Sequence, residues 1–191
     1  MEPLPRRFYD RNAARVAPAL VGCVLVHRDG RGLRTGRIVE TEAYVGEHDL
    51  ACHARVGRTA RTAVMYGEAG RAYVYLIYGI HPMLNAVCGP GASANAVLIR
   101  AVEPTGEGLP WLHKSASGPG NVTKAFGIGL GDNRADLCDP RASLFIAARP
   151  GGPRPRIVLT PRVGVAYSGV WADELLRFCD ATSLHVSPPR P

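Results

Sequence analysis

The stretch AYVYLIYGIHPMLNAVC, residues 72–88, is the clearest structural signal in the chain. Both of its halves are rich in β-branched and aromatic residues, which favour strands. Gly79 stands between the halves, where a glycine lets the backbone reverse sharply. We therefore expect an antiparallel hairpin with a strand over 72–78, a turn over 79–82 and a return strand over 83–88.

The segments on either side of this hairpin predict further strands and few helices. Strands in hairpin order with few helices are typical of an α+β domain built around a mainly antiparallel sheet. A chain of 191 residues with 46% hydrophobic residues fits one such domain with a substantial core. We expect strands over 21–27, 35–45, 96–102 and 156–159 and near Val163, helices from a cap at Asp10 to Ala19 and from Pro119 or Gly120 to Phe126, a long loop over 46–70, and a frayed tail over 187–191.

The chain is basic, with a net charge of +7 and a pI of about 9.5. Such an excess favours a polyanionic partner, because arginine and lysine side chains neutralise phosphates and release counterions. Of its 23 basic residues, all but Lys114 and Lys124 are arginine. Arginine suits two-pronged phosphate contacts, but a genomic preference for arginine would produce the same excess.

The cysteines and the termini indicate the compartment. The 5 cysteines lie far apart with no CxxC spacing, which favours a reducing compartment over a disulfide framework. No apolar run approaches the ~20 residues of a membrane span, and the N-terminal MEPLPRR lacks the hydrophobic region of a signal peptide. We expect a cytoplasmic, nucleoid-associated protein, or a nuclear one in a eukaryote, without membrane contact.

The segment IVETEAYV, residues 38–45, predicts a strand with an unusual face. Because side chains alternate across a strand, the predicted core face comprises Val39, Thr41, Ala43 and Val45, and the other face comprises Ile38, Glu40, Glu42 and Tyr44. Two carboxylates and a phenol on one face indicate either an interior site or a solvated edge.

Arg100 lies in the middle of a nearly continuous apolar run over 96–102, which predicts a strand covered on both faces. A buried arginine is rarely tolerated without a carboxylate partner, and Glu40 or Glu42 is the natural candidate. Such a pair would make the carboxylate face an interior site. In the alternative, the Arg100 side chain extends to the surface and leaves that face solvated.

The hairpin also carries possible contacts to a nucleic acid. Tyr73 and Tyr75 share one strand face and could form a stacking wall for a base. Tyr78 lies on the opposite face or at the tip, where an aromatic side chain could wedge into a base step. Packing in the core is the alternative for these tyrosines. Asn85 stands among apolar residues and needs buried hydrogen-bond partners, which a base edge could supply.

The chain as a whole closely resembles the alkyladenine (3-methyladenine) DNA glycosylase family in its single-domain form. The likeness runs from about residue 4 to 186 and rests on several long motifs in order. These motifs are RIVETEAY (37–44), DLACH (49–53), YVYLIYGI (73–80), LIRAVEP (98–104), SGPG (117–120) and RVGV (162–165).

The resemblance implies a role for each matching residue. Glu42 matches the general base that activates the hydrolytic water, and Arg100 matches the arginine that helps to hold that water. Tyr78 matches an intercalating tyrosine. In the expected base pocket, Tyr44, His53 and Tyr75 match side chains that stack on the flipped base, Ala51 matches a backbone acceptor, Asn85 matches a guard against the amine of guanine, and Tyr73 joins them through its shared face with Tyr75.

The resemblance also implies a fold and an activity. We expect a curved antiparallel sheet with a protruding hairpin, and a monomer that binds double-stranded DNA through the minor groove. The expected reaction is the hydrolytic release of alkylated or deaminated purines such as 3-methyladenine, hypoxanthine and ethenoadenine, without a cofactor. With only Lys114 and Lys124 available, and neither in the carboxylate motif, a Schiff-base lyase is not expected.

Two departures from the family pattern and two other functions stay open. His81 and Pro82 replace aromatic or apolar residues after the expected wedge, and the segment from Thr105 to Ser117 is short, which leaves some phosphate contacts in doubt. A nucleic-acid-binding module without catalysis would explain the charge and the tyrosines. A metal-dependent hydrolase would use the residues of HDLACH (48–53), but further ligands at suitable spacing are missing, so we expect no metal.

Overall fold

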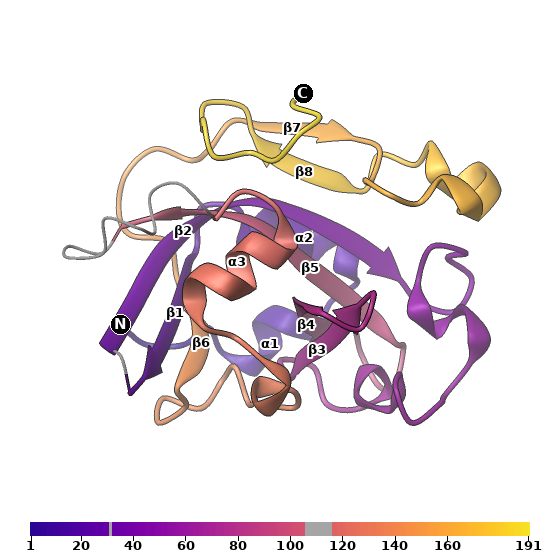
Figure 1. Ribbon diagram of the computed structural model, residues 1–191, viewed down its shortest axis with the longest axis horizontal. Helices are drawn as coiled ribbons and strands as arrows, with labels where there is room; N and C mark the ends of the chain where they lie inside the picture. The colour runs from indigo at the N-terminus through magenta and orange to yellow at the C-terminus, as the bar shows by residue number, and fades with distance from the viewer. Residues whose placement is uncertain (31, 106–115) are drawn as a thin grey trace.

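Residues 1–30, 32–105 and 116–191 are described by the computed structural model, in which eight strands form one sheet (Figure 1). The strands are β1 (Val24–Asp29), β2 (Gly32–Val45), β3 (Ala72–Ile77), β4 (His81–Cys88), β5 (Asn95–Pro104), β6 (Leu144–Ala147), β7 (Ile157–Thr160) and β8 (Arg177–Asp180). The helices are α1 (Arg6–Tyr9), α2 (Ala13–Leu20) and α3 (Pro119–Phe126), with 3₁₀ turns η1 (His53–Val56), η2 (Ala63–Tyr66), η4 (Leu130–Asp132) and η5 (Ala166–Ala172).

The sheet runs in the order β3–β4–β5–β2–β1–β6, while β8 pairs with both β2 and β7. Every one of these strand pairs is antiparallel. Figure 1 shows the long β2 ribbon crossing the molecule, with β7 and β8 along one side of it. The predicted α+β class with a curved, mainly antiparallel sheet is therefore confirmed.

The strand β2 is the centre of the sheet, and its regular alternation is interrupted. Its register with β5 shifts on both sides of Glu40, which marks a bulge. Ile38 consequently lies in the main core, while Val39 packs with Cys179 and Val186 near the C-terminus. The prediction that Ile38 shares the carboxylate face and Val39 the main core face was wrong, because the bulge shifts the side-chain order at this point.

Helix α2 covers the other face of β2. Thr41 Oγ1 donates a hydrogen bond of 2.9 Å to the carbonyl of Ala17, and both residues are fully buried. The helix begins at Ala13 after an Asn12 cap, whose side chain accepts the Ala14 N–H at 2.9 Å. The predicted Asp10 cap was therefore wrong, since asparagine serves equally well as an N-cap two residues later.

The C-terminal region differs from the sequence prediction. No strand forms at Val163, while β6 and β8 were not predicted. The expected frayed tail is also packed at its start, because Ser187 is buried and its N–H donates to Glu40 Oε2 at 2.6 Å. A single polar side chain cannot reveal in the sequence that its backbone closes a buried carboxylate site. Among the described residues, no helix has the length and apolar character to cross a membrane.

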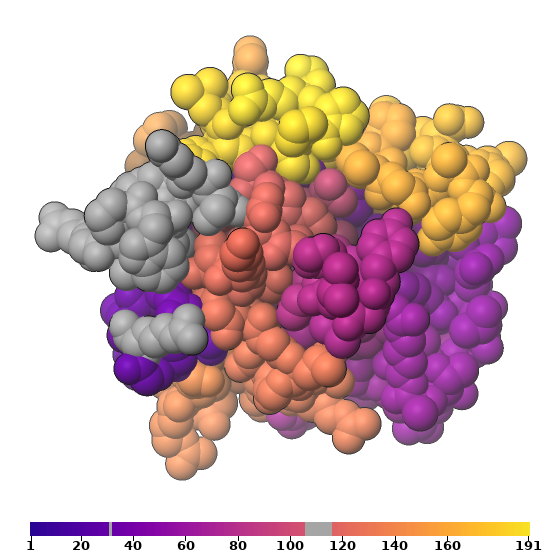
Figure 2. Space-filling model, viewed as in Figure 1, coloured from indigo at the N-terminus to yellow at the C-terminus, as the bar shows by residue number. Residues whose placement is uncertain are grey.

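The predicted β3–β4 hairpin forms, but its reversal lies at residues 78–80. The expected strand end at residue 78 and turn over 79–82 were wrong, because Tyr78 belongs to the tight turn and His81 and Pro82 already belong to β4. Ile80 N–H donates to the Ile77 carbonyl at 3.2 Å, and Tyr78 and Gly79 have φ values of 52° and 72°. Positive φ at both central positions is the requirement of a type I′ turn. Tyr78 is 87% exposed at the tip, and Figure 2 shows this hairpin in magenta near the middle of one face of the molecule.

Candidate active site

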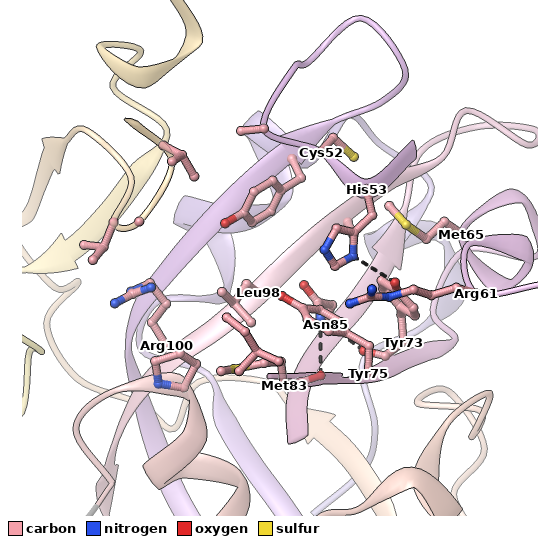
Figure 3. Close-up of a pocket in the computed structure, with 18 of the residues that line it drawn as sticks. Cys52, His53, Arg61, Met65, Tyr73, Tyr75, Met83, Asn85, Leu98 and Arg100 are labelled. Atoms are coloured by element: carbon pink, nitrogen blue, oxygen red, sulfur yellow. Dashed lines mark hydrogen bonds between the residues drawn. The ribbon is translucent and has the colours of Figure 1, made fainter. Parts of the chain in front are cut away.

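A pocket of about 370 Å³ opens beside the hairpin and brings most of the predicted site residues together (Figure 3). Aromatic side chains line it together with polar groups. The predicted residues around it are Tyr44, Ala51, His53, Tyr73, Tyr75, Tyr78, Asn85 and Arg100. Glu42 itself is fully buried behind this lining and contacts three of the residues that form it.

Glu42 is held by donors from three separate segments. Its Oε1 accepts the Val163 N–H at 2.7 Å and lies 3.4 Å from Arg100 Nη1. Its Oε2 accepts the Tyr44 hydroxyl at 2.9 Å. Hydrogen bonds to a carboxylate stabilise its charged form. This face of β2 is therefore an interior site and not a solvated edge.

Glu40 accepts more hydrogen bonds than Glu42 does. Its Oε1 accepts hydrogen bonds from Arg100 Nε at 2.8 Å, Arg177 Nε at 2.7 Å and the Ser187 hydroxyl at 2.9 Å. Arg100 thus contacts both candidate carboxylates, with the shorter distance to Glu40. Glu40 therefore holds the C-terminal segment through Arg177 and Ser187, and Glu42 is the carboxylate next to the pocket.

One wall of the pocket consists of stacked rings. The Tyr73 and Tyr75 rings lie 5.3 Å apart at 34°, and the His53 ring meets Tyr75 edge-on at 4.4 Å. His53 Nδ1 is 2.9 Å from the Tyr73 hydroxyl. Burial, followed by the charges of Arg61 and Arg55, lowers the pKa of His53 to about 4. The His53 ring is therefore uncharged at neutral pH.

Tyr44 connects this wall to the carboxylate. Its hydroxyl donates to Glu42, and its ring lies 4.9 Å from the Arg162 guanidinium carbon. Burial and the neighbouring Glu42 raise the pKa of Tyr44 well above its ordinary value. The phenol therefore stays protonated and remains a donor to Glu42.

Asn85 obtains its buried partners from the hairpin backbone. Its Nδ2 donates to the Tyr73 carbonyl at 3.1 Å and to the Met83 carbonyl at 3.4 Å. The sequence-based need for partners is thus met without a bound base. Because both amide hydrogens are used, the amide oxygen is the part of this side chain with bonding capacity left for a pocket ligand.

The methylpurine-DNA glycosylase family model matches residues 7–183 of this sequence. The chain belongs to this family. A protein of Myxococcus xanthus (strain DK1622) is 50% identical over 100% of this chain and 96% of its own length. Proteins of Anaeromyxobacter dehalogenans (strain 2CP-C) and Legionella pneumophila (strain Lens) are 51% and 48% identical over 98% and 93% of the chain and 88% and 94% of their own lengths. All three are named "Putative 3-methyladenine DNA glycosylase".

In this methylpurine-DNA glycosylase family member, a buried ion pair joins two chain segments that contribute to the pocket lining. Arg162 contacts Asp49 with two nitrogens, at 2.5 and 2.9 Å, and Nη1 also donates to the Ala43 carbonyl at 2.9 Å. Asp49 in turn accepts the Ala51 N–H at 3.0 Å. Sequence reasoning placed both residues in motifs but missed their pairing, because 113 positions separate them.

Arg61 and Tyr167 also line the pocket, although the sequence analysis assigned neither of them a role. The Tyr167 hydroxyl lies 3.4 Å from the Ala51 carbonyl, the predicted acceptor for a base. The loop over 46–70 holds many glycine, arginine and small polar residues, so no pattern distinguished Arg61 from the other arginines in it.

Three of the candidate metal ligands in HDLACH (48–53) have surroundings that do not suit a metal ion. Asp49 is paired with Arg162, His53 contacts Tyr73, and burial raises the pKa of Cys52 to about 11. In the part of the chain that the structure describes, no group of three or more His, Cys, Asp or Glu residues could hold a metal ion.

Of the two departures from the family pattern, His81 and Pro82 lie within the described residues. The Pro82 carbonyl accepts the Thr123 hydroxyl of α3 at 2.8 Å, so the base of the hairpin is braced by this helix. His81 is exposed beside it. In the short segment from Thr105 to Ser117, residues 106–115 lie outside the described residues.

Proposed function

We propose that this protein is a monofunctional DNA glycosylase of base-excision repair. It flips an alkylated or deaminated purine out of double-stranded DNA and hydrolyses its N-glycosidic bond with a water activated by Glu42. An abasic site remains. The observation that carries the proposal is a fully buried Glu42, bound to Tyr44 and next to Arg100, behind a pocket walled by stacked rings.

This constellation suits the chemistry of the bond. An N-glycosidic bond breaks through a sugar with oxocarbenium character, and a neighbouring carboxylate both stabilises that charge and takes a proton from water. Arg100, whose Nη1 lies 3.4 Å from Glu42 Oε1, would help to hold the water and Glu42 in place. An alkylated purine is cationic and already a good leaving group, so one carboxylate is enough for its release.

The pocket lies inside the protein, so the target base must leave the duplex to reach it. A wedge at the hairpin tip would fill the gap that the base leaves. Tyr78 has the exposure and the position for this role, and its positive φ is unfavourable for a non-glycine residue. Strain of this kind is often retained at functional positions. We propose that the tip enters the minor groove.

Several further features complete the proposal. The substrates are purines of the 3-methyladenine, hypoxanthine and ethenoadenine class, of which the names of the relatives mention 3-methyladenine. Lyase chemistry needs an amine nucleophile. Lys124 on α3 does not line the pocket, and Lys114 lies outside the described residues. The enzyme acts as a monomer at the cell's DNA, in the cytoplasm of a bacterium like those of its relatives, without a cofactor.

Incubation with an alkylated duplex in the presence of a chelator tests this function. We expect release of the free damaged base, an intact strand at the abasic site, and no effect of the chelator. A protein that binds the duplex but releases no base would instead be a nucleic-acid-binding module. Release that stops with the chelator would identify a metal-dependent hydrolase and contradict the proposal.

A further inference from the structure

Arg61 places a positive charge at the base end of the pocket. Its guanidinium carbon lies 5.1 Å from the centre of the Tyr75 ring, and Nη2 is 3.5 Å from the Leu76 carbonyl. Figure 3 shows the guanidinium turned toward Tyr73 and Asn85. Across the described residues, no carboxylate oxygen lies within 4.0 Å of it.

The other charges that line the pocket are compensated, and Arg55, which lies 5.4 Å from the centre of the Tyr167 ring, does not itself line it. Arg100 faces Glu40 and Glu42, and Arg162 is paired with Asp49. His53 is uncharged at neutral pH, partly because Arg61 itself lowers its pKa. Among the described residues that line the pocket, Arg61 is therefore the cation without a carboxylate within 4.0 Å, although its side chain is partly open to solvent.

A positive charge there acts differently on neutral and cationic bases. When a neutral purine leaves, the electron pair of the bond to the sugar stays on the purine, which becomes an anion. The water oxygen bonds to the sugar carbon and its proton passes to Glu42, while the purine later takes a proton from solvent. A guanidinium beside the ring stabilises this developing anion. A cationic alkylated purine leaves as a neutral molecule and is repelled while bound.

We propose that Arg61 determines specificity, favouring the release of neutral lesion bases over cationic ones. This inference rests on the proposed glycosylase function. The sequence shows no dedicated acid to protonate a neutral leaving base. Stabilisation of the leaving anion by Arg61 would make such an acid unnecessary. Because Arg61 lines the pocket that would receive the base, its effect is confined to the flipped complex, and a change in general DNA affinity cancels in the ratio of two lesions.

The test compares two duplexes that differ only in the target base, hypoxanthine as the neutral lesion and 3-methyladenine as the cationic one. Neither base carries an amine at C2, so any guarding by Asn85 does not differ between them. Single-turnover release is measured at subsaturating protein, so that each rate compares the transition state with the free duplex, for the wild type, Arg61→Gln and Arg61→Lys, after subtraction of spontaneous depurination. Arg58→Gln is the matched control, because Arg58 is exposed in the same loop and does not line the pocket.

We expect Arg61→Gln to lower the ratio of hypoxanthine to 3-methyladenine release by about 10-fold or more, through loss of one stabilising charge. Arg61→Lys should keep most of the ratio, and Arg58→Gln should leave it unchanged. A ratio that does not move in Arg61→Gln overturns the inference, even if both rates fall equally, as a simple phosphate contact would predict. So does a wild type that releases only 3-methyladenine. A wild type that releases neither base contradicts the proposed function itself.

Discussion

Arg100 lies 2.8 Å from Glu40 and 3.4 Å from Glu42, so one guanidinium contacts both carboxylates of β2. Glu40 also binds Arg177 and both the backbone and the hydroxyl of Ser187, whereas Glu42 binds groups that line the pocket. Two identical side chains two positions apart therefore differ in their surroundings. We infer a structural role for Glu40 and a chemical role for Glu42.

Glu40→Gln should destabilise the protein by about 3–5 kcal/mol, because it leaves two buried arginines without the charge that they share. Glu42→Gln should cost less, since Arg100 keeps Glu40 as its partner. Urea unfolding of both variants measures the difference. Equal losses of unfolding free energy in the two variants would contradict this division of roles.

Tyr78→Asn should separate stability from activity. Asparagine tolerates a positive φ better than tyrosine, and Asn-Gly is the preferred pair for a type I′ turn. The melting temperature should therefore hold or rise. Flipping should become less favourable by about 1–2 kcal/mol, so excision should slow by roughly 10-fold, more for a well-paired lesion than for a mismatched one.

A fluorescent base analogue at the target site reports the flipped population of this variant, beside a melting curve. Normal flipping in Tyr78→Asn would mean that the wedge is not Tyr78. Ile80, which is 68% exposed at the same tip, would then be the next candidate.

Asn85→Ser should relax discrimination against guanine. The Asn85 amide is fixed by two backbone carbonyls, and the shorter serine leaves room where the amine of guanine would lie. We expect the release of 7-methylguanine, relative to hypoxanthine, to rise by about 10-fold, on the scale of one pocket contact. Unchanged relative rates would argue against a guarding role for Asn85.

His27 should make stability depend on pH. Burial lowers its pKa, but Asp132, at 3.5 Å from Nε2, and the Phe126 carbonyl, at 2.6 Å from Nδ1, outweigh this effect and raise the pKa overall. With the folded-state pKa above the unfolded value of about 6.5, this contribution is complete below that pH. It is lost as the pH rises through the folded-state pKa.

Unfolding free energies measured between pH 5 and 9 check the His27 prediction. His27→Gln should remove the decline above about pH 6.5, and the exposed His81→Gln should retain it. The same slope in wild type and His27→Gln would show that another group is responsible.

Sequence alone predicted the parts of the site that follow from local rules. The alternation of Glu42 and Tyr44, an arginine inside an apolar strand, and the tyrosines of one hairpin all lie where these rules place them. The bulge at Glu40 was missed because it depends on pairing with β5 and β8. Arg162 with Asp49 and Ser187 with Glu40 were missed because tertiary packing alone joins residues so distant in the chain.

The most direct test of the account is single-turnover base release by Glu42→Gln, with lesion-duplex binding measured in parallel. Glutamine nearly preserves shape but cannot accept the proton from water, and general-base catalysis contributes about 10²- to 10⁴-fold. We predict that base release falls at least 100-fold on this scale, while the affinity for the lesion duplex stays within a few-fold of wild type. Base release at the wild-type rate by a folded Glu42→Gln protein would contradict the account.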